Sequence, residues 1–175
     1  GAEFNIKDFG MRALLSMRLE KNFPSWFAEL RPIYGPYESR MERFIKINKP
    51  KFIGQKAAKQ ELLHGPKISR TSFIIDADTS DVSGDEPIWA KTEKDYDFID
   101  PPHKHGAKRF NSKGNELSSS NSQQDGKWKV VGWVTSGGYA HSIKASMAQG
   151  YIPTDLSQVT QKGLFEIEIL GKRYP

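Results

Sequence analysis

The segment "KWKVVGWVTSGG", residues 127–138, decides the class of fold that this sequence predicts. It is rich in valine and tryptophan, which favour a β-strand. The overlapping stretch "VTSGGY", residues 134–139, holds the glycines typical of a turn that approaches another part of the molecule closely. Its plainer interpretation is the corner of a hairpin.

Further segments of strand character surround this one, with turn residues between them. In the last of them Phe165, Ile167 and Ile169 share one face, which predicts a half-buried strand. Several short strands with glycine-rich turns predict a small barrel or sandwich. A short helix is expected over residues 140–149. The strand segments are "KISRTSFIIDAD" (67–78), "EPIWA" (86–90), "GYIP" (150–153) and "LFEIEILGKRY" (164–174).

The first third of the chain is different in character. Residues 8–21 predict a helix that Asp8 caps and that Pro24 stops. Apolar residues recur on one face of this helix at Met11, Leu15 and Leu19. Alternation over residues 43–54 predicts a half-buried strand, and residues 54–64 predict a short helix that ends before Gly65-Pro66.

Residues 91–126 are polar and rich in serine, asparagine and glutamine. We expect a long mobile insertion between two strands. The pair His103 and His105 does not predict a metal site, because a zinc site needs a preorganised third ligand.

Composition excludes several classes of function. The chain has 175 residues, a net charge of +5 and no cysteine, so disulfides and cysteine nucleophiles are excluded. No apolar run is long enough to span a bilayer, and no Gly-x-Ser-x-Gly elbow or Walker loop is present. Basic residues gather at 40–51, which indicates either a solvated surface or a binding site for an anion. Aromatic residues do not alternate with these basic residues, as they would in a surface on which nucleic-acid bases stack.

The stretch "MRLEKNFPSWFAEL", residues 17–30, contains an acid in an unusual position. Glu20 lies in the last turn of the predicted helix, where the helix dipole disfavours an anion. A bulky aromatic residue, Trp26, follows it. The residue is therefore either a solvated surface acid or a carboxylate that meets a planar ligand.

Several separated motifs resemble the glycine cleavage T-protein (aminomethyltransferase) superfamily. The resemblance is nearest to the C-terminal half of dimethylglycine and sarcosine dehydrogenase-like flavoproteins. It covers nearly the whole chain except residues 91–126. The motifs are "FGMRALLSMRLEKNFPSWFAEL" (9–30), "RPIYGPYE" (31–38), "KPKFIGQKA" (49–57), "VVGWVTSGGYAHSIKASMAQGYIP" (130–153) and "EIEILGKRYP" (166–175).

The resemblance implies an α+β fold. Residues 1–64 would form the C-terminal, helix-containing part of the folate-binding aminomethyltransferase domain. Residues 65–175 would form a small antiparallel β-barrel of the T-protein C-terminal type, with the insertion at 91–126.

The resemblance also implies a function. The parent protein would oxidise an N-methyl amine with FAD and pass the one-carbon unit to tetrahydrofolate, in a bacterial cytoplasm or the mitochondrial matrix. No nucleic-acid or membrane partner is expected. The alternatives are an aminomethyltransferase or folate-dependent demethylase of the same superfamily, or a non-catalytic module that binds anions or supports assembly.

Site residues follow from the same resemblance. The glutamate of the Arg-Leu-Glu motif binds the pterin of tetrahydrofolate in the family, and here it is Glu20. Its two oxygens match the adjacent N–H donors of a pterin edge. The other expected residues are Trp26 or Tyr34 over the ring, Lys49 at the folate tail, and Tyr139 with His141 by the cavity.

The chain also departs from the family. The catalytic aspartate of the family lies in an N-terminal part that is missing here, and that part would be a partner of this chain. "ESRMERFI", residues 38–45, replaces a stretch of small residues, and Phe27 stands at a usual glycine position. We therefore expect no catalytic residue in this fragment and no activity from the isolated chain.

Overall fold

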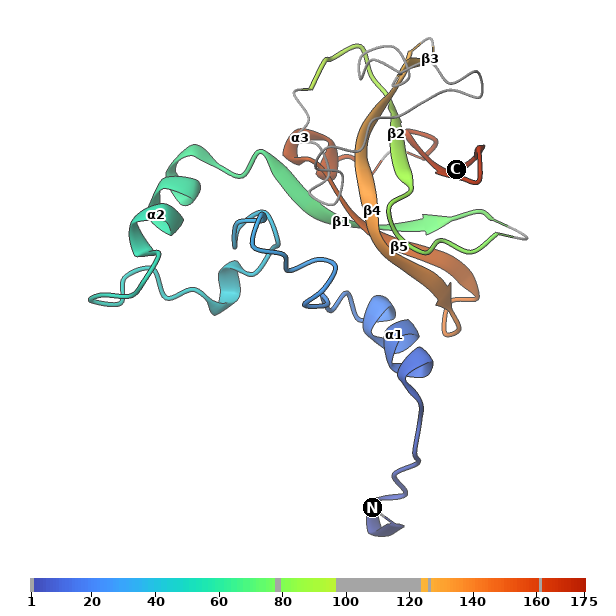
Figure 1. The fold of residues 1–175 in the computed structure, drawn as a ribbon, viewed down its shortest axis with the longest axis horizontal. Helices are drawn as coiled ribbons and strands as arrows, with labels where there is room; N and C mark the ends of the chain where they lie inside the picture. The colour runs from blue at the N-terminus through green and yellow to red at the C-terminus, as the bar shows by residue number, and fades with distance from the viewer. Residues whose placement is uncertain (1, 78–79, 97–123, 126, 161) are drawn as a thin grey trace, which may run out of the picture.

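The computed structural model describes residues 2–77, 80–96, 124–125, 127–160 and 162–175. A helical N-terminal region leads into one curled sheet, and the first residues extend away from both (Figure 1). None of the helices in these ranges combines the length and apolar character needed to cross a membrane. The helices are η1 (Ala2–Phe4), α1 (Met11–Glu20), η2 (Glu42–Phe44), α2 (Gln55–His64) and α3 (Thr154–Ser157).

Seven strands of the described chain form one antiparallel sheet in the order β1-β5-β4-β2-β6-β7, with β3 paired to β4. The backbone N–H of Asp76 donates to the carbonyl of Pro175 at 2.8 Å, which joins the chain just after β1 to the chain just after β7. The two outer strands therefore meet, and the sheet curls toward a barrel. The strands are β1 (Ile68–Ile75), β2 (Pro87–Lys91), β3 (Gln124–Asp125), β4 (Trp128–Ala140), β5 (Ala145–Pro153), β6 (Phe165–Ile169) and β7 (Lys172–Tyr174).

The predicted α+β class and small antiparallel barrel are confirmed. Alternation puts one face of each strand inside, as in β6, where Ile167 and Ile169 are buried. Burial of apolar area is the main favourable contribution to folding. The core of the barrel comprises Ile75, Val82, Ile88, Ala90, Val131, Val134, Ala148, Ile152, Leu156, Ile167, Ile169 and Tyr174.

Two strand glycines allow backbones to approach closely inside the barrel. A Cβ added at Gly132 would lie 1.9 Å from the carbonyl oxygen of Tyr151, and one at Gly150 would lie 2.5 Å from that of Trp133. Gly137 likewise approaches Val82, at 2.5 Å from an added Cβ. The predicted close approach within 134–139 is thus confirmed, but these residues lie in β4 and not at a hairpin corner.

The chain reverses at residues 141–144, and the predicted helix over 140–149 is wrong. Ala145 pairs with Ala140, and β5 continues from there as a strand. This strand is bonded to β4 on one side and β1 on the other. Two rows of ladder hydrogen bonds and a buried face outweigh the helix propensity of its alanines.

The predicted strand over residues 43–54 is also wrong. Residues Glu42–Phe44 form η2, and the side chain of Gln55 donates to the carbonyl of Lys49 at 2.7 Å to hold a turn. Phe44 is largely exposed, so the alternation in this stretch does not reflect burial. The helix predicted over 54–64 is confirmed as α2.

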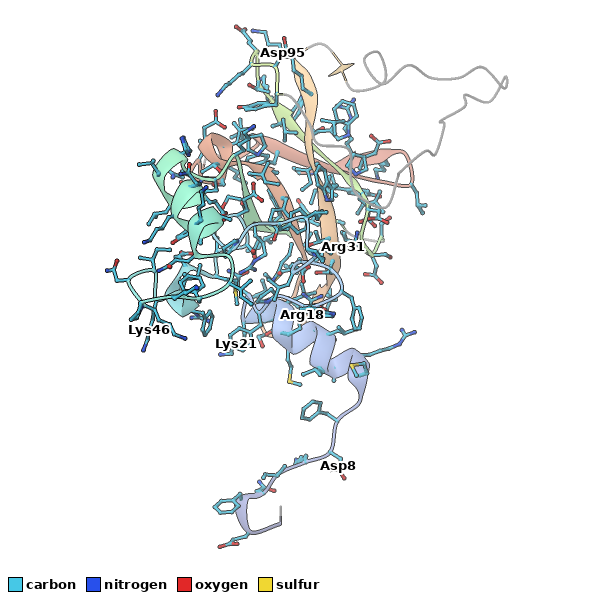
Figure 2. All side chains as sticks on the ribbon, turned by 60° about the vertical axis from the view of Figure 1, so that its left-hand side comes forward. Asp8, Arg18, Lys21, Arg31, Lys46 and Asp95 are labelled. Carbon is cyan, nitrogen blue, oxygen red and sulfur yellow. The ribbon has the colours of Figure 1, made fainter. Side chains whose placement is uncertain are left out.

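The first helix begins later than expected. Gly10 is its N-cap without a side-chain hydrogen bond, so the predicted cap at Asp8 is wrong. Asp8 lies on the extended segment that leads away from the protein (Figure 2). Leu19 is buried, whereas Met11 is 69% exposed and Leu15 is also exposed. The apolar stripe of α1 is thus only partly covered within this chain.

The polar insertion predicted at 91–126 falls mostly outside the described residues, as do His103 and His105. At its described ends, Lys91 closes β2 and Gln124–Asp125 form β3.

The close approach at Gly132 gives a test of the barrel. Gly132→Ala is expected to lower the free energy of unfolding by at least about 2 kcal/mol, because the new methyl group meets a backbone oxygen that cannot move aside. Urea denaturation followed by tryptophan fluorescence measures this change. Gly10→Ala is the control, since an added Cβ there meets nothing within 4 Å and only the weaker N-cap preference of alanine, less than about 1 kcal/mol, acts against it. Equal stability of the two variants would contradict the packing described.

Candidate functional site

Glu20, in the last turn of α1, lies beside the turn that joins β4 to β5. The backbone N–H of Ser142 donates to Glu20 Oε1 at 3.1 Å. One helical turn earlier, the hydroxyl of Ser16 donates to the carbonyl of Tyr139 at 2.7 Å. Helix α1 packs on both strands of this hairpin. The helix and the hairpin therefore meet along one line of contacts.

The surroundings of Glu20 favour its charged form. The hydroxyl and the backbone N–H of Ser142 hydrogen-bond the carboxylate, and with the neighbouring His141 they hold the pKa of Glu20 below its ordinary value of 4.5. The carboxylate is only partly covered. Glu20 is thus an ionised and partly exposed acceptor at neutral pH.

Two aromatic side chains belong to the same turn region as Ser142, and one of them, His141, acts on the Glu20 carboxylate. Tyr139 and His141 form an edge-to-face pair with ring centroids 5.1 Å apart, and the Tyr139 side chain is exposed. We call Glu20, Tyr139, His141 and Ser142 the α1–hairpin site. Of the residues predicted from sequence, the structure brings Glu20, Tyr139 and His141 together here.

Tyr34 lies elsewhere, in the core. Its ring stacks on Tyr151 with centroids 3.7 Å apart, and its hydroxyl accepts a hydrogen bond from Trp133 Nε1 at 3.0 Å. Burial raises the pKa of Tyr34 to about 12. Trp26 is 70% exposed in the loop after α1, and Lys49 is exposed in the turn before α2.

Sequence reasoning missed Glu29, whose side chain is fully buried. Its Oε2 accepts from Arg18 Nη1 at 2.9 Å and from the backbone N–H of Ser25 at 2.7 Å. Its Oε1 accepts from the hydroxyl of Thr135 at 2.7 Å and from that of Ser136. The carboxylate joins α1, the following loop and β4. The only sequence signal is the Glu-Leu pair at 29–30 within the family-like motif.

Arg70 on β1 was missed as well. It is buried and donates to Asn22 Oδ1 at 2.6 Å, to the carbonyl of Ser39 at 3.0 Å and to Gln149 Oε1 at 3.3 Å. Burial lowers the pKa of the guanidinium. The residue ties the loop after α1 to β1 and β5, and its place in an alternating strand gives no sequence signal for this role.

The Pro36–Glu38 motif forms a turn held by two acids. Glu38 Oε2 accepts from the backbone N–H of Gly35 at 2.9 Å. Glu61 of α2 accepts from the N–H groups of Tyr37 and Glu38 at 2.9 and 3.0 Å. Burial raises the pKa of Glu38, and the nearby Glu61 adds to this shift. The motif thus serves to fix α2 to the segment after α1.

No cluster of three His, Cys, Asp or Glu residues in the described chain is arranged to hold a metal ion.

The hydrogen bonds to Glu20 can be tested by titration. Ser142→Ala is expected to raise the pKa of Glu20 toward 4.5, because the hydroxyl of Ser142 contributes most to the lowered value. The measurement is a carboxyl ¹³C NMR titration of the labelled chain. Ser157→Ala, whose hydroxyl instead donates to the carbonyl of Thr154, is the control. A pKa that stays unchanged in Ser142→Ala would contradict the contact.

Comparison with known proteins agrees with the resemblance. The family described as glycine cleavage T-protein C-terminal barrel domain matches residues 70–175, and the GCVT N-terminal domain family matches residues 1–49. Mitochondrial dimethylglycine dehydrogenase of Mus musculus is 36% identical over the whole chain, which spans 16% of that relative. Mitochondrial sarcosine dehydrogenase of Homo sapiens is 31% identical over 51% of the chain, in an alignment that spans 10% of that relative.

A solved structure supports the fold. The glycine cleavage system aminomethyltransferase T from Bartonella henselae matches 94% of this chain and 36% of its own, with a TM-score of 0.62 at 21% identity. The predicted barrel of the T-protein type is thereby confirmed. With a family match over residues 70–175, the chain belongs to the glycine cleavage T-protein family.

Proposed function

We propose that this chain is the C-terminal, tetrahydrofolate-binding module of a larger dimethylglycine or sarcosine dehydrogenase-like protein. That protein passes a one-carbon unit from an N-methyl amine to tetrahydrofolate. The similarity to dimethylglycine dehydrogenase over the whole chain supports this assignment. The chain spans only 16% of that relative. In this proposal FAD and the amine are bound by residues outside it.

The observation that carries the proposal is the ionised, partly open carboxylate of Glu20 beside Tyr139. A pterin presents two adjacent donors, the ring N3–H and the 2-amino group, and a carboxylate offers two parallel acceptors. Ser142 and the backbone N–H of His141 take up part of the acceptor capacity of the Glu20 carboxylate, whose two oxygens have two lone pairs each. Glu20 thus binds and orients the pterin edge, and the hairpin keeps the acid charged.

The predicted aromatic residues take different roles in this proposal. Tyr139, with His141, and the exposed Trp26 contact the flat ring, because an aromatic face stacks well on a planar heterocycle. Tyr34 does not contact the ring in this proposal, since it is stacked on Tyr151 in the core.

We also propose the domain division at residues 64 and 65, supported by family matches on either side of it. In this proposal, a part of the larger protein outside this chain covers the exposed apolar face of α1 and contributes the rest of the cavity. The isolated chain is therefore inactive. The mitochondrial relatives support the matrix as the location, and a bacterial cytoplasm is the equivalent.

The superfamily alternatives share the same pterin contacts. An aminomethyltransferase or folate-dependent demethylase differs in the amine that supplies the carbon, which is bound by residues outside this chain. A non-catalytic module has no need of the Glu20 contact, and binding measurements separate it from the others.

Removing the charge of Glu20 tests the proposal. In the complete protein, Glu20→Gln is expected to weaken tetrahydrofolate binding by about 1–3 kcal/mol, roughly a 5- to 150-fold rise in Kd, because one acceptor becomes a mismatched donor. Isothermal titration calorimetry measures the Kd. Glu93→Gln is the matched control on an exposed barrel side chain. Equal affinities of Glu20→Gln and wild type would favour a non-catalytic module.

Lys49 is proposed to attract the glutamate tail of the folate. Lys49→Ala is expected to raise the Kd of a polyglutamyl folate about two- to fivefold and to leave that of the monoglutamate nearly unchanged, because an exposed point charge contributes modestly. Lys127→Ala, an exposed lysine on the barrel, is the control. An equal effect on both folates would exclude a tail contact.

A further inference from the structure

The buried carboxylate of Glu29 gathers donors from three separate parts of the chain. Arg18 belongs to α1, Ser25 to the following loop, and Thr135 and Ser136 to β4. The side chain is completely inaccessible, so it cannot touch a ligand. Whatever it contributes to binding must act through the elements that it joins.

Those elements are the ones that form the α1–hairpin site. Arg18 precedes Glu20 by two residues on α1, and it lies where the helix meets the sheet (Figure 2). Thr135 and Ser136 precede Tyr139 on the same strand. The ion pair of Glu29 with Arg18 and the hydrogen bond between Glu20 and Ser142 thus lie at two points where the same helix is attached to the same hairpin.

The packing between these two points of attachment is close but thin. Leu19 is the buried residue of α1, and its Cδ1 lies 3.4 Å from a Cβ added at Gly138. The other apolar side chains of the helix are exposed. Within the described chain, hydrogen bonds therefore contribute much of what fixes the register and the rotation of α1 on β4.

The ion pair is not arranged for stability alone. The Nε of Arg18 is buried and has no hydrogen-bond partner within the described chain, although Nη1 meets Glu29. Charges removed from water carry a desolvation cost, so a buried pair is weak evidence for stability. The best-attested role of such a pair is to fix the register of two elements.

We propose that Glu29, with Arg18, is a positioning residue of the folate site. It holds α1 in register on β4 so that the carboxylate of Glu20 meets the N–H of Ser142 and faces the pterin edge. This inference rests on the proposed function for its ligand. It predicts that tetrahydrofolate affinity depends on an acid that the ligand never touches.

A double-mutant cycle in the complete protein tests the inference. Glu29→Gln is expected to raise the Kd of tetrahydrofolate about five- to tenfold, and the variant with both Glu20→Gln and Glu29→Gln should bind like Glu20→Gln alone. Such non-additivity is the signature of one residue that acts through another. Affinity of Glu29→Gln equal to wild type, or losses that multiply in the double variant, would overturn the proposal.

Two further variants separate positioning from general loss of stability. Glu61→Gln makes the same chemical change in an acid that fastens the turn at 35–39 to α2, and it should leave the Kd unchanged. Thr135→Val removes one donor to Glu29 and should raise the Kd about twofold even if Glu29→Gln does not fold. A rise in Kd for Glu61→Gln as large as for Glu29→Gln would refute a specific role.

Hydrogen exchange measured by mass spectrometry supplies a readout that needs no ligand. Peptides covering residues 139–144 should exchange faster in Glu29→Gln, or in Thr135→Val, than in Glu61→Gln, because the hairpin loses its bond to Glu20. If Glu20→Gln leaves binding unchanged, the proposed ligand is wrong, and this exchange experiment still decides the positioning role. Unchanged exchange in both Glu29→Gln and Thr135→Val would overturn it.

Discussion

A carboxylate without solvent contact joins helix α1 and the loop after it to the barrel. Glu29 accepts hydrogen bonds from a helix, a loop and a strand more than one hundred residues away. A buried charge is tolerated only when it is fully paired. We propose that this pairing fixes the position of α1 on the barrel and, with it, the position of Glu20.

The barrel contributes rigidity to the same arrangement. Strands β4 and β5 form a long hairpin whose far end reaches α1 (Figure 1). Glycines at 132 and 150 let neighbouring backbones pass closely inside the barrel. The tip at 139–142 is thus held by the core at one end and by α1 at the other. A ligand that meets both Glu20 and Tyr139 touches parts of the chain that belong to the two matched family regions.

The barrel and α2 are largely predictable from sequence. Apolar and polar residues that alternate along a segment indicate a strand, and Gly65-Pro66 indicates the end of a helix. Residues 43–54 and 140–149 were mispredicted because burial and strand pairing, which are not local, decide their conformation. The neighbourhood of Glu20 and Tyr139 came from resemblance to a family. The role of Glu29 was not predicted because an acidic residue in a sequence is normally expected to be exposed to solvent. Its partners Thr135 and Ser136 are brought next to it only by the fold.

The most direct test of the account is an experimental structure of the complete protein with tetrahydrofolate bound. We expect both oxygens of Glu20 at about 2.7–3.2 Å from the ring N3 and the 2-amino nitrogen of the pterin, with the N–H of Ser142 still bonded to the same carboxylate. A pterin bound elsewhere, with Glu20 facing open solvent, would contradict it.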